Sequence, residues 1–358
     1  MTTLQDTKKS SGNGGSAGNG GKDGRAISLS SRQWLGPVIA LVLVIIVNGI
    51  ISPAFFNVKV VDGHLYGSLV DIVHRGASTA LVAVGMAIVI GTRGIDLSVG
   101  SVIAISGAVM AVLIRDTSLS PAIIILAALG AGILCGLWNG ILVAFLDIQP
   151  IIATLILMVA GRGIAQMITD GQIVTFHGAF FEAIGSGYLV GVPWRVIIAA
   201  IVIAGLWAVM RKTALGLFVE AVGGNARASR LAGIDARGIK VLAYVISGFC
   251  SAVAGIIIAA DIRGADANNA GLWLELDAIL AVVVGGASLM GGRFYLGLTV
   301  IGVLIIQALG TGILLSGLPS QYTLIVKAAV VMIVLLVQAP KARQMMGNFW
   351  RRRNRNGQ

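Results

Sequence analysis

The segment GTRGIDLSVGS contains residue types that could form a polar path through an apolar protein. Glycines such as Gly94 would break or loosen a helix at this point. Asp96 then precedes an apolar run, where its carboxylate can accept hydrogen bonds from the backbone N–H groups of Ser98 or Val99. Half-helices that meet inside a membrane expose polar helix ends. The alternative is a plain interhelical turn in which Arg93 neutralises Asp96.

Three glycines recur every four residues in GAGILCGLWNG and therefore lie on one face of a helix: Gly132, Gly136 and Gly140. Their missing side chains would let the backbone of a neighbouring helix approach closely. Asn139 lies beside this stripe and can hydrogen-bond across helices or line a path. Helix packing is the favoured interpretation for the stripe and for Asn139.

A basic connection over residues 211–240 has the features of a docking segment. Asn225 can cap a short helix over residues 226–232, which Gly233 would end. A short semi-apolar helix suits a groove on a partner protein, although a basic loop at the lipid headgroups is an equal alternative. The candidate docking residues are Glu220, Gly223, Asn225, Arg227, Arg230, Leu231 and Gly233.

Acids and amides gather in residues 261–293. Four carboxylates there are expected to face Arg263: Asp261, Asp266, Glu275 and Asp277. Together with Trp273 at a membrane mouth, they could bind a polyol or a soluble partner. Charges within apolar spans are costly and therefore either functional or anchoring, which applies to Arg162, Asp277, Arg293 and Lys327. The full set of candidate path or helix-break residues is Gly94, Asp96, Ser98, Asn139, Asn268, Asn269, Glu275, Asp277 and Gln307.

Several kinds of chemistry find no support in the sequence. The three histidines, at 64, 74 and 177, are scattered, and no spacing resembles a metal site or a Ser-His-Asp set. Cys135 and Cys250 both fall within apolar runs, which argues against a disulfide framework. No segment offers a nucleotide-binding loop. We expect no cofactor or metal in this chain, and any ATP hydrolysis must come from another chain.

The composition requires a lipid solvent for most of the chain. Of its 358 residues, 57% are hydrophobic and only 11% are charged, against about 25% charged residues in soluble domains. We therefore predict an all-α polytopic membrane protein with about ten transmembrane helices and a broken helix near residues 91–97. The predicted spans are 34–51, 72–91, 97–114, 121–146, 150–168, 194–210, 240–260, 276–290, 294–315 and 321–338.

The basic residues predict the orientation. Residues 1–33, 211–240 and 341–358 hold 17 of the 26 lysines and arginines, which places these three stretches in the cytoplasm by the positive-inside rule. Ten spans satisfy all three clusters. The net charge of +11 is thereby explained without nucleic acid. We expect a disordered polar tail over 1–33, a membrane domain over 34–340 and a basic tail over 341–358.

From residue 34 to 338 the chain resembles the permease subunits of bacterial sugar ABC importers of the ribose/xylose/galactose class. Residues 156–176 and 259–283 are especially similar to the permeases of galactofuranose importers. The most specific matches are GIDLSVGS at Gly94–Ser101, KTALGLFVEAVGGN at Lys212–Asn225, LAGI at Leu231–Ile234 and LDAILAVVVGGASLMGGR at Leu276–Arg293.

This resemblance implies a permease subunit in the bacterial inner membrane with both termini in the cytoplasm. Its implied partners are an ATP-binding subunit carrying ATP and Mg, a second permease (a heteromer is favoured), a periplasmic sugar-binding protein and membrane lipid. It also implies that the 211–240 segment docks the ATPase and that the substrate is galactofuranose or a related monosaccharide. The alternatives are an ABC permease for a nucleoside or amino acid, an ion-coupled secondary transporter, or a receptor that transports nothing. A secondary transporter would need a buried relay of charges, but its candidates Asp96, Asp277 and Lys327 are separated along the chain with no evident pairing.

Overall fold

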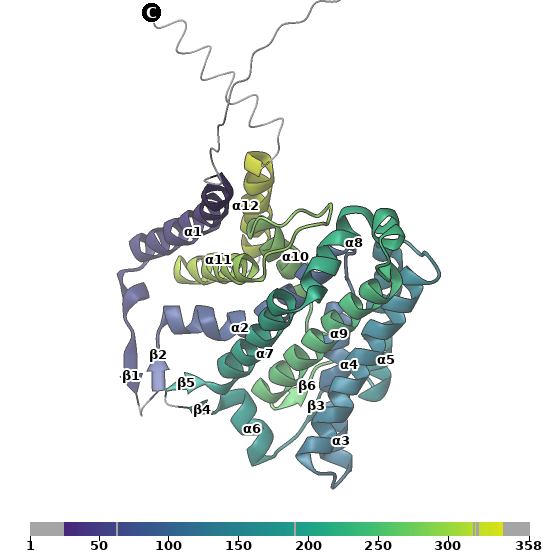
Figure 1. The fold of residues 1–358 in the computed structure, drawn as a ribbon. Coiled ribbons are helices and arrows are strands. Elements are labelled where there is room, and N and C mark those ends of the chain that lie inside the picture. The colour runs from purple at the N-terminus through teal and green to yellow at the C-terminus, as the bar shows by residue number, and fades with distance from the viewer. Residues whose placement is uncertain (1–24, 62–63, 190, 318, 320–321, 339–358) are drawn as a thin grey trace, which may run out of the picture.

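The computed structural model describes residues 25–338 except 62–63, 190, 318 and 320–321, and this part of the chain is mainly α-helical (Figure 1). The helices are α1 (Arg25–Ile51), α2 (Ser68–Gly91), α3 (Val99–Asp116), α4 (Pro121–Ala144), α5 (Pro150–Ile168), α6 (Ala179–Ser186), α7 (Trp194–Lys212), α8 (Ala214–Leu231), α9 (Ala236–Asp261), α10 (Leu274–Val284), α11 (Leu296–Leu315) and α12 (Tyr322–Gln338), with a 3-10 turn at Pro53–Phe56.

Three two-stranded antiparallel sheets lie in the connections between helices. They pair β1 (Lys59–Val61) with β2 (His64–Tyr66), β3 (Val174–Thr175) with β6 (Gly264–Ala265), and β4 (Tyr188–Leu189) with β5 (Val192–Pro193).

Among the described residues, eight helices are long and apolar enough to cross a bilayer: α1, α2, α3, α4, α5, α7, α9 and α11. The shorter helices α10 and α12 occupy the positions of the other two predicted spans. The prediction of an all-α polytopic membrane protein with about ten spans is confirmed. The gap between α2 and α3 also gives the predicted helix break, since residues 92–98 are non-helical.

The eighth predicted span, residues 276–290, is wrong as a continuous helix. Helix α10 has 11 residues and is therefore about 16 Å long, well short of the ~30 Å hydrocarbon core. The helix stops because Gly286 adopts the left-handed conformation (φ 87°). Hydropathy missed this stop because the residues before and after the glycine pair are apolar.

Two further boundaries differ from the prediction. The segment 211–240 is mostly helical, because α7 continues to Lys212, α8 fills residues 214–231 and α9 starts at Ala236. Helix α1 begins at Arg25 rather than at residue 34. Most of the predicted first tail (residues 1–24) and all of the second (341–358) lie outside the described residues.

Helices α2 and α9 pass through the middle of the bundle, with α3, α4 and α5 on one side and α1, α11 and α12 on the other (Figure 1). Among the described residues, the most extensive contact between two helices is that of α4 with α9. A Cβ atom at Gly136 would lie 3.0 Å from both the Tyr244 carbonyl carbon and the Val245 Cα atom. Gly132 and Gly140 meet the backbone of α9 in the same way. The glycine stripe of α4 thus faces a helix backbone.

Two groups of connections between helices contact one another in the bundle. Strand β3 follows α5 and strand β6 follows α9, and the two strands pair in the register Val174↔Ala265 and Thr175↔Gly264. Both strands lie in segments predicted to be on one side of the membrane. The opposite end carries the turn after α2, the kink of α8 and the loop before α11, which contact one another.

Candidate functional site

Asp96 is buried in the break between α2 and α3, with a relative exposure of 2%. Its Oδ1 accepts hydrogen bonds from the Ser98 backbone N–H (3.0 Å) and the Ser98 hydroxyl (2.6 Å). Its Oδ2 accepts a bond from the Ser247 hydroxyl of α9 at 2.7 Å. The expected bond to the Ser98 N–H is therefore present. Three donors satisfy a carboxylate that has no cation as a hydrogen-bond partner among the described residues.

Helix α4 joins this network through Asn139, which is fully buried. The Asn139 amide donates to the Ser98 hydroxyl at 2.8 Å, so the helix break is bonded to α4 as well as α9. The Asn139 Oδ1 atom has no hydrogen-bond partner in the described part of the chain. Sequence reasoning missed Ser247, because a serine in an apolar helix gives no local signal of its long-range partner.

Arg93 does not pair with Asp96. Its Nε donates to the Met290 carbonyl at 2.9 Å and its Nη2 donates to the Gly224 carbonyl at 2.8 Å. The expectation that Arg93 could neutralise Asp96 in a plain turn is wrong, because its guanidinium points to the loop before α11 and to α8. Alongside, the Gly292 N–H donates to the Gly91 carbonyl at 3.0 Å. Three segments far apart in sequence are thus joined at one end of the bundle.

The docking segment contains a kink at Asn225, whose backbone (φ −158°, ψ 97°) is not helical. The Asn225 Oδ1 accepts hydrogen bonds from the N–H groups of Arg227 (3.1 Å) and Ala228 (3.0 Å), as a helix cap does. Gly233 follows the end of α8 with φ 85°. The structure therefore has the capped short helix at the place where the sequence predicts one.

Several side chains of this short helix face outward, while Ser229 is buried. Leu231 is 86% exposed, and Arg227 and Arg230 are also exposed. Gly223, in contrast, is buried close to the Gly91 carbonyl oxygen and to the backbone N of Gly292, and Glu220 is half-buried. The segment has one part packed into the bundle and another part that is free to contact a partner.

The polar candidates at the other end form a smaller group than expected. The Gln166 amide donates to Asn268 Oδ1 at 2.6 Å, and Arg162 donates to the carbonyls of Ala267 (3.0 Å) and Ala270 (2.6 Å). Asn269 lies beside them and bonds to Asp266, while Glu275 is buried against Gly100 of α3. Arg293 is exposed in the loop before α11, away from this group.

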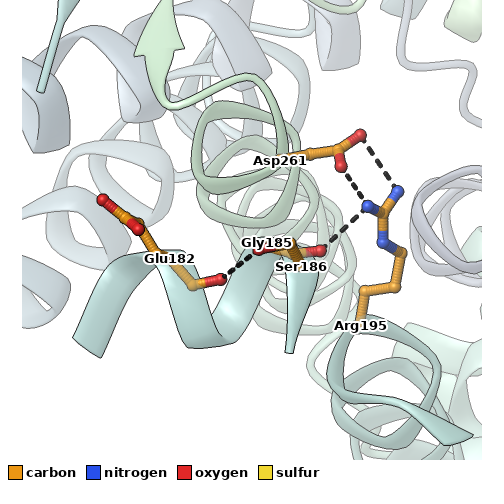
Figure 2. A network of polar contacts seen from close by, with 5 residues as sticks. All are labelled: Glu182, Gly185, Ser186, Arg195 and Asp261. Atoms are coloured by element: carbon orange, nitrogen blue, oxygen red, sulfur yellow. Dashed lines mark hydrogen bonds and ion pairs between the residues drawn. The ribbon is translucent and has the colours of Figure 1, made fainter. Parts of the chain in front are cut away.

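The acids expected to face Arg263 have other partners. Asp261 makes a two-pronged ion pair with Arg195, including a 3.0 Å bond from Nη1, and Arg195 also donates to the Gly185 carbonyl at 2.9 Å (Figure 2). Arg263 lies 3.6 Å from Glu182 instead. The ion pair joins the end of α9 to the start of α7, and the bond to Gly185 joins the start of α7 to the end of α6. Chain proximity suggested Arg263, but α6 packs against α9 and the start of α7 contacts α6, which brings Arg195 to Asp261.

Asp277 and Lys327 form an ion pair at 2.7 Å between α10 and α12, and both side chains are largely buried. We expected no pairing between them because of their separation along the chain, and this expectation is wrong. Gln307 of α11 donates to the Thr79 hydroxyl at 3.1 Å. The structure therefore brings together Asp96, Ser98 and Asn139, whereas Asp277 and Gln307 have partners elsewhere.

The sequence matches a family of membrane transport proteins. A model of the branched-chain amino acid transport system permease component matches residues 68–335 of the chain. The matched region extends from α2 into α12 and includes the helix break, the docking segment and the polar residues at both ends.

Curated relatives cover nearly the whole chain. The galactofuranose transporter permease protein YtfT of Escherichia coli K12 is 59% identical over 85% of this chain and 89% of its own. The ribose import permease protein RbsC of E. coli K12 is 39% identical over 87% of this chain and 96% of its own. The fructose import permease protein FruF of Bifidobacterium longum is 38% identical over 90% of this chain and 92% of its own. This chain belongs to the family of branched-chain amino acid transport system permease components and is a multi-pass membrane permease subunit of the ABC importer class.

Proposed function

We propose that this chain is the translocating subunit of an ATP-driven importer and that it carries galactofuranose or a related monosaccharide. The observation that carries this proposal is the 59% identity to the galactofuranose permease, which exceeds the 39% and 38% identities to the ribose and fructose permeases. The amino acid alternative rests on the description of the family as a whole. The relatives named for sugars favour a sugar.

Free energy for transport enters from a separate ATP-binding subunit that carries ATP and Mg. Moving a two-state permease from mostly outward-open to mostly inward-open takes about 5.5 kcal/mol of differential binding. The chain contains no nucleotide-binding loop that could supply this free energy. The exposed Leu231, Arg227 and Arg230 on a capped helix support docking of the ATPase at the end of α8.

Arg93 couples the docked ATPase to the translocation path. Movement of α8 at Gly224 acts directly on the Arg93 guanidinium, and Arg93 is three residues before Asp96. Asp96 is in turn bonded to α9 through Ser247. A shift of α8 therefore reaches the break between α2 and α3 through hydrogen bonds, and the two half-helices change their packing.

The proposed assembly has this chain in the bacterial inner membrane with both termini in the cytoplasm. The basic clusters support this orientation, because α8 then lies on the cytoplasmic side. A second permease completes the pathway, with a heteromer favoured, and a periplasmic binding protein delivers the sugar to the end that carries Gln166 and Asn268. No cofactor is bound by this chain.

Substrate uptake tests the function. The chain is expressed in cells with the ATP-binding and substrate-binding proteins encoded beside it, and uptake of labelled galactofuranose, ribose and leucine is measured. We expect galactofuranose uptake that continues when the membrane potential is dissipated at constant ATP. Leucine as the preferred substrate would overturn the sugar assignment. Loss of uptake when the membrane potential is dissipated at constant ATP would overturn the ATP-driven mechanism.

Docking is tested separately with Leu231→Asp and with charge reversal at Arg227 and Arg230. We expect these variants to insert normally but to lose ATPase co-purification and transport. Arg237→Glu is the matched control, because Arg237 is also exposed near this end but stacks on Phe145 at 5.6 Å outside the short helix. Full transport by the docking variants would refute the docking role.

A further inference from the structure

A hollow of about 400 Å³ lies between α2, α7 and α11, and neither the proposed transport path nor the short helix over residues 226–232 uses it. Its volume is within the range of ~300–1,000 Å³ that is usual for small-molecule sites. Small residues create it: Gly76 and Ala80 on α2, Ala200 and Ala204 on α7, and Gly297 on α11. Larger side chains at these positions would close the space between the three helices.

The lining of the hollow is entirely apolar. It contains aliphatic side chains, glycines and the ring of Trp207, and no charged residue or amide. All three helices are long and apolar enough to span a bilayer, so the hollow faces hydrocarbon rather than water. An acyl chain that moves from the bilayer into the hollow gains no free energy of transfer from water, but it gains dispersion contacts with three helices. The chemistry of the hollow therefore matches an acyl chain.

One end of the hollow has the residues that bind a lipid headgroup. Trp207 lines the hollow, and the Arg211 guanidinium lies 5.5 Å from its ring centroid. Lys212 follows Arg211, and both are exposed. The Trp34 ring lies close to Gly297, which also lines the hollow. Tryptophans and basic residues together are typical of the membrane–water interface, where the basic groups attract anionic headgroups.

We propose that this hollow binds an anionic phospholipid, with one acyl chain between α2, α7 and α11 and the phosphate at Arg211 and Lys212. A helix from a second permease is the competing occupant. An α-helix with its side chains is about 10–12 Å across and would rest on the rim. It would also leave Arg211 and Lys212 without an anion, whereas a phospholipid meets both the apolar hollow and the basic end.

The test is native mass spectrometry of the purified chain titrated with phosphatidylglycerol, with phosphatidylcholine as the neutral probe. Ala204→Phe fills the hollow, and Arg211→Gln removes the charge. Each has a matched control: Ile201→Phe adds the same ring to a 66% exposed position of α7 outside the hollow, and Arg237→Gln removes the charge from the other arginine–aromatic pair.

We expect wild-type protein to bind one phosphatidylglycerol more tightly than phosphatidylcholine. Ala204→Phe should weaken that site by about tenfold, since the ring displaces the acyl chain and about ten carbon–carbon contacts of ~0.1–0.2 kcal/mol each are lost. Arg211→Gln should weaken it by about fivefold, the equivalent of ~1 kcal/mol per basic residue. Neither control should change it.

Three results would overturn the proposal. Equal effects of Ala204→Phe and Ile201→Phe would mean that the lipid does not occupy the hollow. Loss of binding in Arg211→Gln but not in Ala204→Phe would mean attraction at the headgroup surface alone. Unchanged lipid binding in Ala204→Phe with loss of a second permease copy, seen by mass in the same spectra, would mean that a helix fills the hollow.

Discussion

The Arg93 guanidinium donates a 2.8 Å hydrogen bond to the carbonyl oxygen of Gly224, a residue 131 positions away in the chain. Gly224 is directly before the kink of α8, and Arg93 is in the turn that follows α2, with a backbone φ of 67°. A non-glycine residue in the left-handed region is uncommon and is held there by its surroundings. The bond therefore connects a fixed turn at the helix break to the segment that is free to contact a partner.

Arg93→Ala should separate ATP hydrolysis from transport. The variant loses the hydrogen bonds that Arg93 donates to two carbonyl oxygens. Because Arg93 is exposed, we expect little loss of thermal stability and normal assembly with the ATPase. Transport should fall several-fold while basal ATPase activity stays. Arg93→Lys should be intermediate, because lysine keeps the charge but lacks the planar fork that reaches two carbonyls.

The measurement is ATPase activity with and without substrate-loaded binding protein, alongside uptake, in the same preparation. Arg115→Ala is the control, because Arg115 is an exposed arginine in a different part of the bundle, at the end of α3, and forms an ion pair with its neighbour Asp116. Wild-type uptake in Arg93→Ala would show that α8 acts on the helix break by another route.

Gly136→Ala should destabilise the protein, because the new methyl group would lie 3.0 Å from backbone atoms of Tyr244 and Val245. Helix backbones cannot move aside singly, so α4 and α9 must separate at a cost of about 1–3 kcal/mol. Gly130→Ala on the same helix is the matched control, since nothing lies within 4 Å of its added Cβ. That change should be neutral or should stabilise by up to ~1 kcal/mol. Thermal unfolding in detergent compares the two, and equal melting temperatures would refute close packing at Gly136.

Asp96→Ala should be considerably more damaging than Asp96→Asn. Alanine leaves three donors without a partner, those of the Ser98 N–H, the Ser98 hydroxyl and the Ser247 hydroxyl, and each buried unpaired donor costs about 1–3 kcal/mol. Asparagine keeps one oxygen for Ser98 and can turn its amide N–H toward the Ser247 oxygen. Thermal unfolding should therefore give higher melting temperatures for wild type and Asp96→Asn than for Asp96→Ala. An alanine variant as stable as wild type would show that the network carries no stability.

Local sequence features predicted much of this fold. The cap at Asn225 and the end of its helix at Gly233 depend only on neighbouring residues, and both are present. The same holds for the packing of the Gly136 stripe, which follows from helical periodicity. The end of α10 before Gly286 was missed. Hydropathy shows how long an apolar segment is, but it does not show whether the backbone of that segment stays helical.

Long-range partners could not be predicted from spacing. Asp261 was assigned to Arg263 because the two are close in sequence, whereas the fold brings it to Arg195. Asp277 was expected to face Arg263 for the same reason, whereas its partner Lys327 comes from another helix. The packing of helices that are far apart in the chain decides which charged side chains form ion pairs. The residues next to each charge do not indicate that packing.

Asp266 should give the connection between α9 and α10 a dependence on acidic pH. The pKa of Asp266 is held below its ordinary value of about 3.9, first because the Asn269 side chain donates to Oδ2 at 2.8 Å, and then because the N–H groups of Asn269 and Asn268 donate to Oδ1. A depressed carboxyl pKa contributes stability that is present above the unfolded value and is lost as the pH falls through the folded value.

Asp266→Asn tests this dependence, because asparagine imitates the protonated acid. At neutral pH it should unfold at a lower temperature than wild type, and the difference should shrink toward zero as the pH falls below about 4. Asn269→Ala removes the strongest donor, so its own loss of stability should begin at a higher pH than that of wild type. A temperature difference between wild type and Asp266→Asn that is the same at pH 7 and pH 3 would mean that the Asp266 charge contributes nothing to this connection.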